Sequence, residues 1–387
     1  MSVGSYDVVV AGAGAAGLMT AIRAGQRGRR VLVLEHTDKV GAKILISGGG
    51  RCNFTNLDAR PEAFLSANAH FCKSALARYT QHDFIALVNR HGIAWHEKTL
   101  GQLFCDGSAR QVVAMLRAEA SAVGVEIRTG HRITGIERRK RFEIATDHGP
   151  LDAASLVLAT GGLSIPKMGA TGFAHDVARR FGLAVTQTRP GLVPFTLPVP
   201  ALAGVSLEVE TRLGAARFRE ALLFTHRGLS GPAVLQVSSY WTPGQAVTVD
   251  LLPDLDAAAW LKEGKRTRPR AELRTLLAER LPQRLAQHLA DETGSDAPMA
   301  ERRDRDLEAL AQRLKAWRVE PTGTEGYAKA EVTVGGVDTA ALSSRTMEAR
   351  AVPGLFVVGE AVDVTGWLGG YNFQWAWSSG WAAGEAA

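Results

Sequence analysis

Residues 6–35, YDVVVAGAGAAGLMTAIRAGQRGRRVLVLE, decide the fold of this chain. The apolar run at 6–10 predicts a buried strand, the turn Gly12-Ala-Gly14-Ala-Ala-Gly17 opens an amphipathic helix, and 30–34 predicts a second strand. Glu35 ends that strand, 23 residues after Gly12. Strand, glycines, helix, strand and acid in this order are typical of a βαβ unit that binds a dinucleotide, whereas a glycine-rich turn of another α/β protein need not keep the spacing.

The glycines and the acid of this unit each have a physical role in such a site. Gly12 allows the tight turn, Gly14 lets the backbone approach a pyrophosphate, and Gly17 lets the helix pack closely on the strand. The start of the helix presents N–H groups to the phosphates. Glu35 is placed to accept hydrogen bonds from ribose hydroxyls. We therefore favour a dinucleotide site here.

The composition bounds the class of protein. The chain has 387 residues, of which 46% are hydrophobic and 22% charged, as in globular proteins. Lys and Arg exceed Asp and Glu by six, which suits anionic partners without identifying one. Three dispersed cysteines exclude a disulfide framework and a Cys-rich zinc site, and no metal is expected. The apolar run at 8–22 is short, interrupted by glycines and preceded by Asp7, so we expect a cytoplasmic protein without a signal peptide or membrane span.

Three later segments predict where the chain returns to the first sheet. The loop 47–56 offers three glycines, the cation Arg51 and two asparagine amides, which suits wrapping a large polar ligand. The apolar segment 156–162 ends in Thr-Gly-Gly, and 354–360 ends in an acid. Two late strands with glycine-rich corners indicate that distant segments frame one extended cofactor, which the glycines alone do not identify as FAD or NAD.

The middle of the chain changes character twice. From Pro190 to Asp250, short β-branched runs alternate with Gly and Pro turns, which predicts strands. After Pro253, leucines recur at helical spacing among Arg and Glu, at 273–281 and at 307–317. Four tryptophans near the end could stack a base or ring, but we favour aromatic packing of the last helix; they are Trp367, Trp375, Trp377 and Trp381.

Five motifs together carry a resemblance. They are Gly12–Gly17, KILISGGGRCN at 43–53, LATGGLS at 158–164, FTHRGLSGP at 224–232 and GWLGGYNFQ at 366–374. This set, which spans essentially the whole chain, resembles the YhiN-type flavoproteins, the BaiN/RdsA family of NAD(P)/FAD-dependent oxidoreductases. The segments FCKSALARY at 71–79 and AWHEKTLGQLFC at 94–105 make the resemblance closest to its enterobacterial branch.

The resemblance implies an α/β fold in which a Rossmann-like, glutathione-reductase-type FAD domain is interrupted by a β-rich domain and a helical subdomain. The implied divisions follow the changes in composition. They are 1–189 for the first part of the FAD domain, 190–253 plus 319–345 for the β-rich insertion, 254–318 for the helical subdomain and 346–387 for the C-terminal part of the FAD domain.

The resemblance also implies which residues hold FAD. The pyrophosphate and ribose would meet Gly12, Gly14, Ala15, Ala16, Gly17 and Glu35; the loop near the pyrophosphate and ring would be Gly48, Gly49, Gly50, Arg51 and Asn53; the strand ends would supply Thr160, Gly161, Gly359 and Glu360; and the last helix would begin at Gly369, Gly370, Tyr371 and Asn372. The dipole of that helix would stabilise negative charge on reduced flavin. A plain helix-start turn is the alternative for Gly369 and Gly370.

The sequence has one strand–GxGxxG–helix unit and no CxxC dithiol. We therefore expect NAD(P)H to visit the flavin transiently, unless electrons come from elsewhere, and hydride to pass from flavin N5 to the substrate. In the enterobacterial branch, the resemblance implies that a uridine of large-subunit ribosomal RNA is reduced to dihydrouridine. Saturating its C5=C6 bond needs a hydride at C6 and a proton at C5.

Cys52 is our first candidate for the proton donor, although its neighbour Arg51 could lower the pKa of the thiol and weaken it as an acid. The alternative is that Cys52 is a small loop residue without chemistry. For RNA binding we single out the basic residues before one predicted helix, for which a solvated charged face is the alternative. They are Lys262, Lys265, Arg266, Arg268 and Arg270.

Two other classes of function stay open at this point. One is a small-molecule flavoenzyme, such as an ene-type reductase or an amine oxidase, which needs a closed apolar pocket. The other is a non-catalytic, flavin-containing RNA-binding protein.

Overall fold

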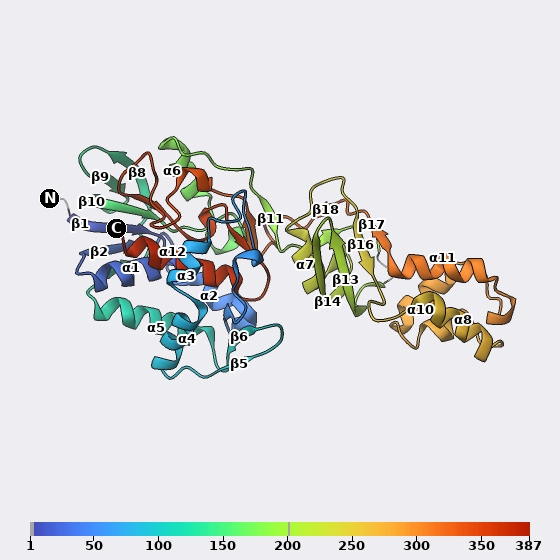
Figure 1. The fold of residues 1–387 in the computed structure, drawn as a ribbon. Coiled ribbons are helices and arrows are strands. Elements are labelled where there is room, and N and C mark those ends of the chain that lie inside the picture. The colour runs from blue at the N-terminus through green and yellow to red at the C-terminus, as the bar shows by residue number, and fades with distance from the viewer. Residues whose placement is uncertain (1–3, 200–201) are drawn as a thin grey trace. The chain divides into compact units, whose positions relative to one another are not determined.

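The computed structural model describes residues 4–199 and 202–387, which form two compact units. Unit 1 comprises Met1–Pro190 and Glu331–Ala387, and unit 2 comprises Gly191–Ala330. Figure 1 shows the elements of both along the chain. Residues 331–345 therefore lie in unit 1 and not in the β-rich insertion to which the sequence analysis assigned them. In the described ranges, no helix has the length and apolar character that crossing a membrane requires.

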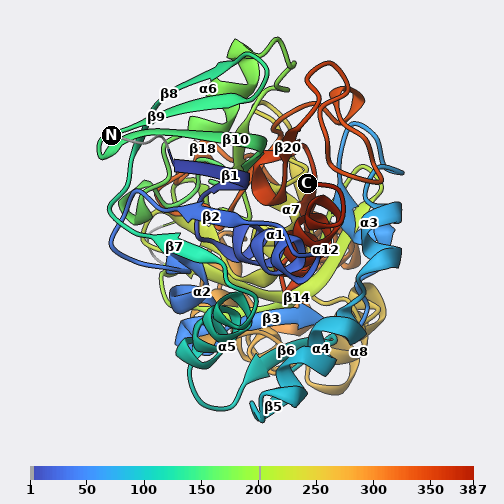
Figure 2. The same cartoon turned by 90° about the vertical axis from the view of Figure 1, so that its left-hand side faces the viewer.

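Unit 1 is built on a seven-stranded sheet that draws strands from both of its chain segments (Figure 2). The strand order is β7 (Glu126–Arg128), β2 (Val31–Leu34), β1 (Gly4–Ala11), β10 (Gly149–Leu158), β9 (Phe142–Thr146) and β8 (Ile133–Arg138), with β20 (Leu355–Val357) also paired to β10. Strands β7, β2, β1, β10 and β20 are parallel, whereas β9 and β8 are antiparallel. Parallel strands are buried on both faces, which explains the continuous apolar runs.

The helices of unit 1 pack against this sheet and against each other. They are α1 (Ala15–Gln26), α2 (Ala42–Ile46), α3 (Lys73–Arg78), α4 (Gln81–Arg90), α5 (Ala109–Ala122), α6 (Phe173–Arg180) and α12 (Tyr371–Gly384). The predicted βαβ unit at 6–35 is confirmed as β1, α1 and β2. Helices α1 and α12 approach closely because a Cβ on Gly380 would lie 2.4 Å from the carbonyl oxygen of Ala16. Of the four tryptophans predicted to pack with the last helix, Trp375 and Trp377 are buried in the core, whereas Trp367 and Trp381 are only partly buried.

A small antiparallel sheet lies beside the glycine-rich loop of unit 1. It consists of β3 (Asn53–Asn56), β6 (Gln102–Cys105) and β5 (Trp95–Glu97), with β6 in the centre. The short strands β4 (Phe64–Leu65) and β21 (Thr365–Gly366) pair separately, and β11 (Arg189–Gly191) and β19 (Val332–Val334) pair as well. The small sheet follows α2 and the tight turn at 47–50 directly, so it determines where the glycine-rich loop lies.

Unit 2 contains an antiparallel sheet and a group of helices, as its composition predicts. The sheet order is β17 (Trp317–Val319), β16 (Val247–Asp250), β13 (Ser206–Leu213), β14 (Ala216–Thr225), β15 (Gly228–Ser230), β12 (Phe195–Thr196) and β18 (Gly323–Thr324). The helices are α7 (Pro232–Ser238), α8 (Ala257–Thr267), α9 (Leu273–Leu277), α10 (Gln283–Asp291) and α11 (Asp304–Lys315). The recurring leucines at 273–281 and 307–314 are buried between these helices.

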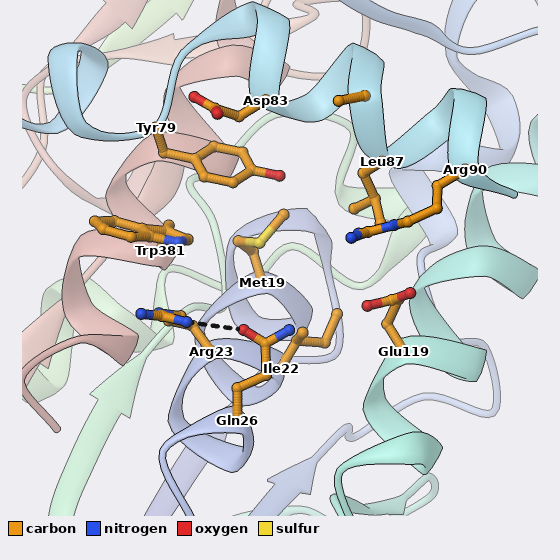
Figure 3. Close-up of a pocket in the computed structure, with 11 residues that line it drawn as sticks. Met19, Ile22, Arg23, Gln26, Tyr79, Asp83, Leu87, Arg90, Glu119 and Trp381 are labelled. Atoms are coloured by element: carbon orange, nitrogen blue, oxygen red, sulfur yellow. Dashed lines mark hydrogen bonds between the residues drawn. The ribbon is translucent and has the colours of Figure 1, made fainter.

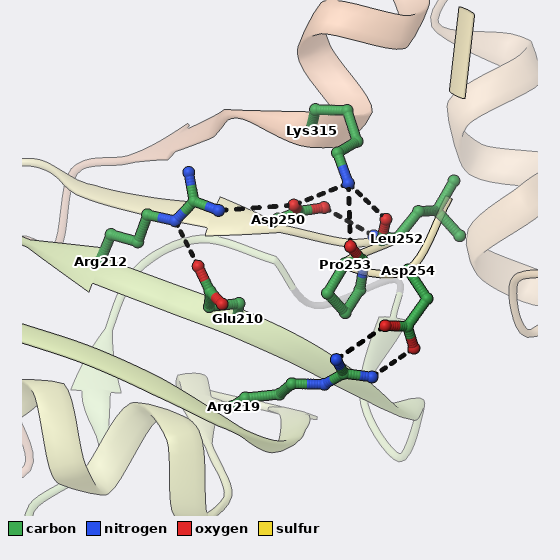
Figure 4. Close-up of polar contacts among 8 residues, drawn as sticks. All are labelled: Glu210, Arg212, Arg219, Asp250, Leu252, Pro253, Asp254 and Lys315. Carbon is green, nitrogen blue, oxygen red and sulfur yellow. Dashed lines mark hydrogen bonds and ion pairs between the residues drawn. The ribbon is translucent and has the colours of Figure 1, made fainter. Parts of the chain in front are cut away.

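A buried acid joins the sheet and the helices of unit 2 (Figure 4). Asp250, at the end of β16, is 2% exposed and lies 2.9 Å from the Lys315 ammonium at the end of α11. It also accepts a hydrogen bond of 3.0 Å from the N–H of Leu252 and lies 3.8 Å from the Arg212 guanidinium. Because a buried carboxylate needs compensation, this pair holds the last turn of α11 on the edge of the sheet.

Candidate functional site

The glycine-rich turn lies where β1 ends, at the edge of the parallel sheet at which ligands bind in such folds. Gly12 has φ 107°, and a Cβ there would lie 2.6 Å from the carbonyl oxygen of Ala159. A Cβ on Gly17 would lie 2.0 Å from the carbonyl oxygen of Gly12. By contrast, a Cβ on Gly14 would have no heavy atom of the described chain within 4 Å, apart from its neighbours in the chain and in its own helix. Packing thus explains two glycines, and the third leaves its backbone accessible to another group.

The acid at the end of β2 is tied to this turn. One oxygen of Glu35 accepts a hydrogen bond of 3.0 Å from the N–H of Ala13. The other accepts bonds of 2.9 Å from both the N–H and the hydroxyl of Thr37. No side chain caps the start of α1 at Gly14, so its first N–H groups face outward without a side-chain acceptor. The turn, the helix start and the acid therefore form one rigid polar edge.

A second acid lies just after β20, in a network that the sequence analysis missed. The Glu360 carboxylate accepts hydrogen bonds from the Lys43 ammonium (2.6 Å), the Ser164 hydroxyl (2.7 Å) and the N–H of Thr333 (2.9 Å). Burial by itself would raise the pKa of Glu360, but the Lys43 charge and these hydrogen bonds outweigh it and hold the pKa below its usual range. The network around Glu360 therefore favours the charged form of its carboxylate.

The Thr-Gly-Gly corner after β10 connects this network to the glycine-rich turn. A Cβ on Gly12 would lie 3.1 Å from the Cα of Thr160, and one on Gly161 would lie 3.8 Å from a Glu360 oxygen. The Thr160 hydroxyl is buried and has no hydrogen-bond partner within the described chain. A Cβ on Gly359 would lie 2.9 Å from the side chain of Ala16 on α1. The strand ends that we predicted to converge do so.

The loop after α2 requires its three glycines. Gly48, Gly49 and Gly50 have φ of 56°, 67° and 85°, a left-handed run that other residues rarely adopt. A Cβ on Gly48 would lie 2.8 Å from the ring of Phe104 in β6. Arg51 is exposed, and no ion pair joins it to any residue in 4–199 or 202–387. The loop therefore presents a left-handed glycine backbone and one available cation.

Cys52 does not fit the role that the sequence suggested for it. Its side chain is completely buried, so no surface of the thiol is available to a flavin or a nucleobase. Burial raises the pKa of Cys52 to about 12, and the opposing effect comes from the hydrogen bond with Ser47 and not from Arg51. The residue occupies a left-handed position, φ 52°, and donates its N–H to the carbonyl of Ser47 over 3.0 Å. We therefore do not retain it as a proton donor.

The start of α12 is pressed against the small sheet. Gly369 has φ 109°, and a Cβ there would lie 2.9 Å from the side chain of Gln102 in β6. Gly370 has φ 96°, and a Cβ there would lie 2.3 Å from the carbonyl oxygen of Thr55 in β3. No side chain caps the helix. Glycine is thus required for close approach at both positions, and the positive end of the α12 dipole lies beside β3 and β6.

The other two predicted residues at this helix start support the preceding loop. The Asn372 amide donates to the carbonyl of Gly366 over 2.9 Å and accepts from its N–H over 2.8 Å. The Tyr371 ring packs edge-on against Phe64 and Trp367, each with a centroid distance of 6.0 Å. Asn53 in β3 lies close by, since a Cβ on Gly370 would be 2.9 Å from its side-chain amide. Asn372 and Tyr371 therefore hold the loop in place.

The basic cluster predicted to bind RNA is largely neutralised. Four of its five members form ion pairs with carboxylates on the same or neighbouring helices: Lys262 with Glu308, Lys265 with Asp304, Arg266 with Glu263 and Arg268 with Glu279. Arg270 is the member for which no ion pair is found within the described residues. Unit 2 has 19 Lys and Arg against 18 Asp and Glu, and unit 1 has 26 against 21. Most of the basic excess therefore lies in unit 1.

A pocket of about 290 Å³ lies elsewhere in unit 1, between α1, α4, α5 and α12 (Figure 3). Met19, Ile22 and Leu87 form its apolar floor, and the stacked rings of Tyr79 and Trp381 form one end. The residues that α1 contributes to this pocket begin at Met19, away from the glycine-rich turn at the start of that helix. It is separate from the converging strand ends.

Comparison with known proteins places these features in context. A family model described as "HI0933-like protein Rossmann domain" matches residues 6–386. The chain is 54% identical to a protein of Escherichia coli (strain K12) named ribosomal RNA dihydrouridine synthase, over 98% of this chain and 97% of that one. It is 47% identical to a Haemophilus influenzae protein of the same name, over 99% and 98%. The solved structure of a 3-ketosteroid-Δ4-(5α)-dehydrogenase from Rhodococcus jostii RHA1 aligns with TM-score 0.50 at 17% identity, over 98% of this chain and 97% of that one, which bears on the fold alone.

Proposed function

The chain belongs to the HI0933-like family, and we propose that it is an FAD-dependent oxidoreductase that reduces a uridine of large-subunit ribosomal RNA to dihydrouridine. The observation that carries this proposal is the full-length similarity to two proteins named ribosomal RNA dihydrouridine synthase. The geometry of the strand ends in unit 1 is consistent with it, because it offers a continuous polar edge for a dinucleotide.

The residues present fit FAD. Gly12 and Gly17 leave no room for a side chain, while the backbone at Gly14 is accessible, as a pyrophosphate site requires. The carboxylate of Glu35 stands at the end of β2, where such sites bind ribose. The buried hydroxyl of Thr160 lacks a partner among the described residues, and a polar ligand group at the corner would supply one. We propose that Glu360, held ionised by Lys43, lines the same cofactor site.

FAD would supply the hydride at N5. The protein has to bind the uracil, hold it against the ring and exclude water. The uncapped start of α12 stabilises negative charge nearby. A guanidinium serves as a fixed cation and a hydrogen-bond donor, so we assign Arg51 to electrostatic binding of a phosphate or a uracil carbonyl and not to proton transfer. With Cys52 buried, the proton at C5 comes from another group or from water.

We further propose NAD(P)H as the transient electron donor and the cytoplasm as the compartment. The sequence has a single strand–GxGxxG–helix unit, and FAD would occupy it, so a nicotinamide has to approach the flavin directly. Ribosomal RNA and NAD(P)H meet in the cytoplasm.

The decisive experiment incubates FAD-loaded protein with NADPH and unmodified large-subunit ribosomal RNA and counts dihydrouridine by mass spectrometry. We expect an increase that depends on both NADPH and active protein. A count equal to that of a heat-inactivated control would remove the RNA reductase function. Oxidation of NADPH with steroid-like enones but not with RNA would favour the small-molecule alternative.

The cofactor site has its own test in Gly14→Ala. The added methyl group meets no protein atom but would enter the space that a pyrophosphate needs, so we expect FAD affinity to fall at least about 10-fold. The free energy of unfolding of the apoprotein should fall by no more than about 1 kcal/mol. Gly135→Ala in β8 is the matched control, because its Cβ would make an ordinary contact of 3.6 Å. Equal FAD affinity in the two variants would contradict the assignment.

A further inference from the structure

Three large apolar side chains are exposed by more than a third in the described chain: Ile46 (45%), Leu57 (37%) and Leu100 (65%). All three lie within 55 residues of sequence, on the segments around the glycine-rich loop. Single exposed apolar residues are common and carry no message. Two of these three, however, are held side by side on a rigid support.

The support is the tight turn between β5 and β6. The N–H of Lys98 bonds to the carbonyl of Gln102 over 3.0 Å, and the N–H of Gln102 bonds back to the carbonyl of Thr99 over 3.0 Å. Leu100, at the tip, has φ 52°, a left-handed conformation that is unfavourable for leucine. Strained backbone at an exposed apolar residue is a frequent feature of functional sites. Folding alone does not explain a leucine here, because glycine would fit better and the side chain is mostly exposed.

One buried amide ties this tip to the candidate cofactor site. The Asn56 side chain donates to the carbonyl of Leu100 over 3.1 Å and to the carbonyl of Gly369 over 2.9 Å. Next to it, the N–H of Leu57 bonds to the carbonyl of Gly101 over 2.8 Å. Strands β3, β5 and β6 lie together in Figure 2. The two leucines are therefore fixed relative to the start of α12.

Charges of both signs lie around the leucines. The Glu97 carboxylate accepts a hydrogen bond of 3.1 Å from the N–H of Gly101, and Asp58 pairs with Arg60 at 3.2 Å. Lys98, in the same turn as Leu100, pairs with no carboxylate in the part of the chain that the structure describes. An apolar tip with an available cation in the same turn matches a nucleic acid, in which stacked bases alternate with phosphates.

We propose that Leu57 and Leu100 form an apolar wedge that enters the base stack of the RNA beside the target uridine. The proposal rests on the proposed function. A stacked uracil cannot lie against a flavin, so an enzyme acting on it must turn the base out or use an unstacked one. Leucine side chains inserted between bases separate them and cover the faces that are left. Asn56 is then a positioning residue, since it sets the distance between the wedge and the start of α12.

The test uses the ribosomal RNA stem-loop that the wild-type holoenzyme modifies, mapped by mass spectrometry, with 2-aminopurine placed next to the target uridine. Wild-type protein should raise the 2-aminopurine fluorescence, because the neighbouring base becomes unstacked. Leu100→Gly removes the wedge and relieves the left-handed strain, so it should fold at least as well as wild type. We expect it to lose the fluorescence rise and at least about 10-fold in kcat/KM on the stem-loop, with unchanged reduction of bound FAD by NADPH.

Thr99→Ser in the same turn is the matched control and should behave as wild type. Leu57→Ser should show a smaller loss in the same direction. If Leu100→Gly unstacks and modifies the stem-loop as well as wild type, the wedge is wrong while the proposed function stands. If wild-type protein forms no dihydrouridine in any ribosomal RNA, the proposed function fails and the wedge fails with it.

Discussion

Units 1 and 2 both carry clusters of lysine and arginine, but they use them differently. On α8 and the turn after it, Lys265 pairs with Asp304 and Arg268 pairs with Glu279. This surface therefore consists largely of exposed ion pairs. Around the glycine-rich loop of unit 1, Arg51 and Lys98 have no such partner in the described residues. The number of lysines and arginines in a segment therefore does not show which of their cations are available to a ligand.

The two units also differ in how each uses an acid that is paired with a lysine. Asp250 in unit 2 pairs with Lys315 where two elements of that unit meet, and the pair serves the fold. Glu360 in unit 1 pairs with Lys43 at the strand ends where the cofactor site is proposed. The two ion pairs are similar in chemistry, but one stabilises the fold of unit 2 and the other lies at the proposed cofactor site. Their positions in the backbone distinguish the two roles.

The largest expected effect tests whether the backbone is packed more tightly at the glycine-rich turn of unit 1 than at α8 of unit 2. Gly17→Ala places a methyl group 2.0 Å from a backbone oxygen that cannot move away, so we expect the free energy of unfolding to fall by more than about 3 kcal/mol. Gly264→Ala on α8 of unit 2 meets the flexible end of Leu276 at 2.4 Å and should cost less than about 2 kcal/mol. Urea unfolding of both variants gives the comparison. Equal losses would show that the turn is no tighter than an ordinary helix contact.

The next effect separates the two ion pairs. Lys43→Met leaves the partly buried Glu360 carboxylate without a charged partner, whereas Lys315→Met leaves Asp250 with the more distant Arg212 guanidinium at 3.8 Å. Each variant should lower the free energy of unfolding by about 1–3 kcal/mol at neutral pH. Only Lys43→Met should also weaken FAD binding, measured by quenching of flavin fluorescence. An equal loss of FAD affinity in Lys315→Met would contradict the separation of roles.

The pH dependence of the Lys43 variant follows from the sign of the pKa shift. In the wild type, the pKa of Glu360 is lowered, so its contribution to stability is present above its ordinary pKa and is lost as the pH falls through the lowered value. Without Lys43, burial raises the pKa, and the variant should lose stability relative to wild type as the pH rises from about 5 to 8. Adding Glu360→Gln should remove that slope, as thermal unfolding at several pH values would reveal.

A smaller effect concerns RNA affinity. Arg51→Ala with Lys98→Ala should weaken binding of ribosomal RNA about 10-fold at low salt and reduce the slope of log affinity against log salt by about two. Replacing Lys265, Arg266 and Arg268 together should change the affinity less than about 3-fold, because ion pairs with carboxylates already satisfy them. Fluorescence anisotropy titrations at two salt concentrations measure both. The reverse ranking would return RNA binding to the helices of unit 2.

The smallest effect is expected at Cys52. Because its thiol is fully buried and its pKa is raised to about 12, Cys52→Ala should keep turnover within about 2-fold. The lost packing should cost no more than about 1–2 kcal/mol of stability. A loss of turnover with FAD still bound would mean that the thiol reaches the substrate after all.

Local patterns carried much of this protein's description. The turn Gly12–Gly17 and the acid Glu35 are defined by backbone needs within one βαβ unit, so their spacing alone predicted the first strands and helix correctly. The glycines at 48–50 stood out as a loop for a similar reason, whereas Gly369 and Gly370 were singled out only through the family resemblance, and their left-handed backbone became visible in the structure.

Only the tertiary structure decided the rest. Lys43 and Glu360 are 317 residues apart, and no periodicity could pair them. Cys52 reads as a loop residue until β3 and β6 close over it, and the cations of α8 read as a basic patch until α11 brings its carboxylates alongside. Backbone conformation is set by neighbours in the chain, so it could be predicted from the order of the residues. Burial and ion pairing are set by segments that meet only when the chain has folded, so they could not be predicted in this way.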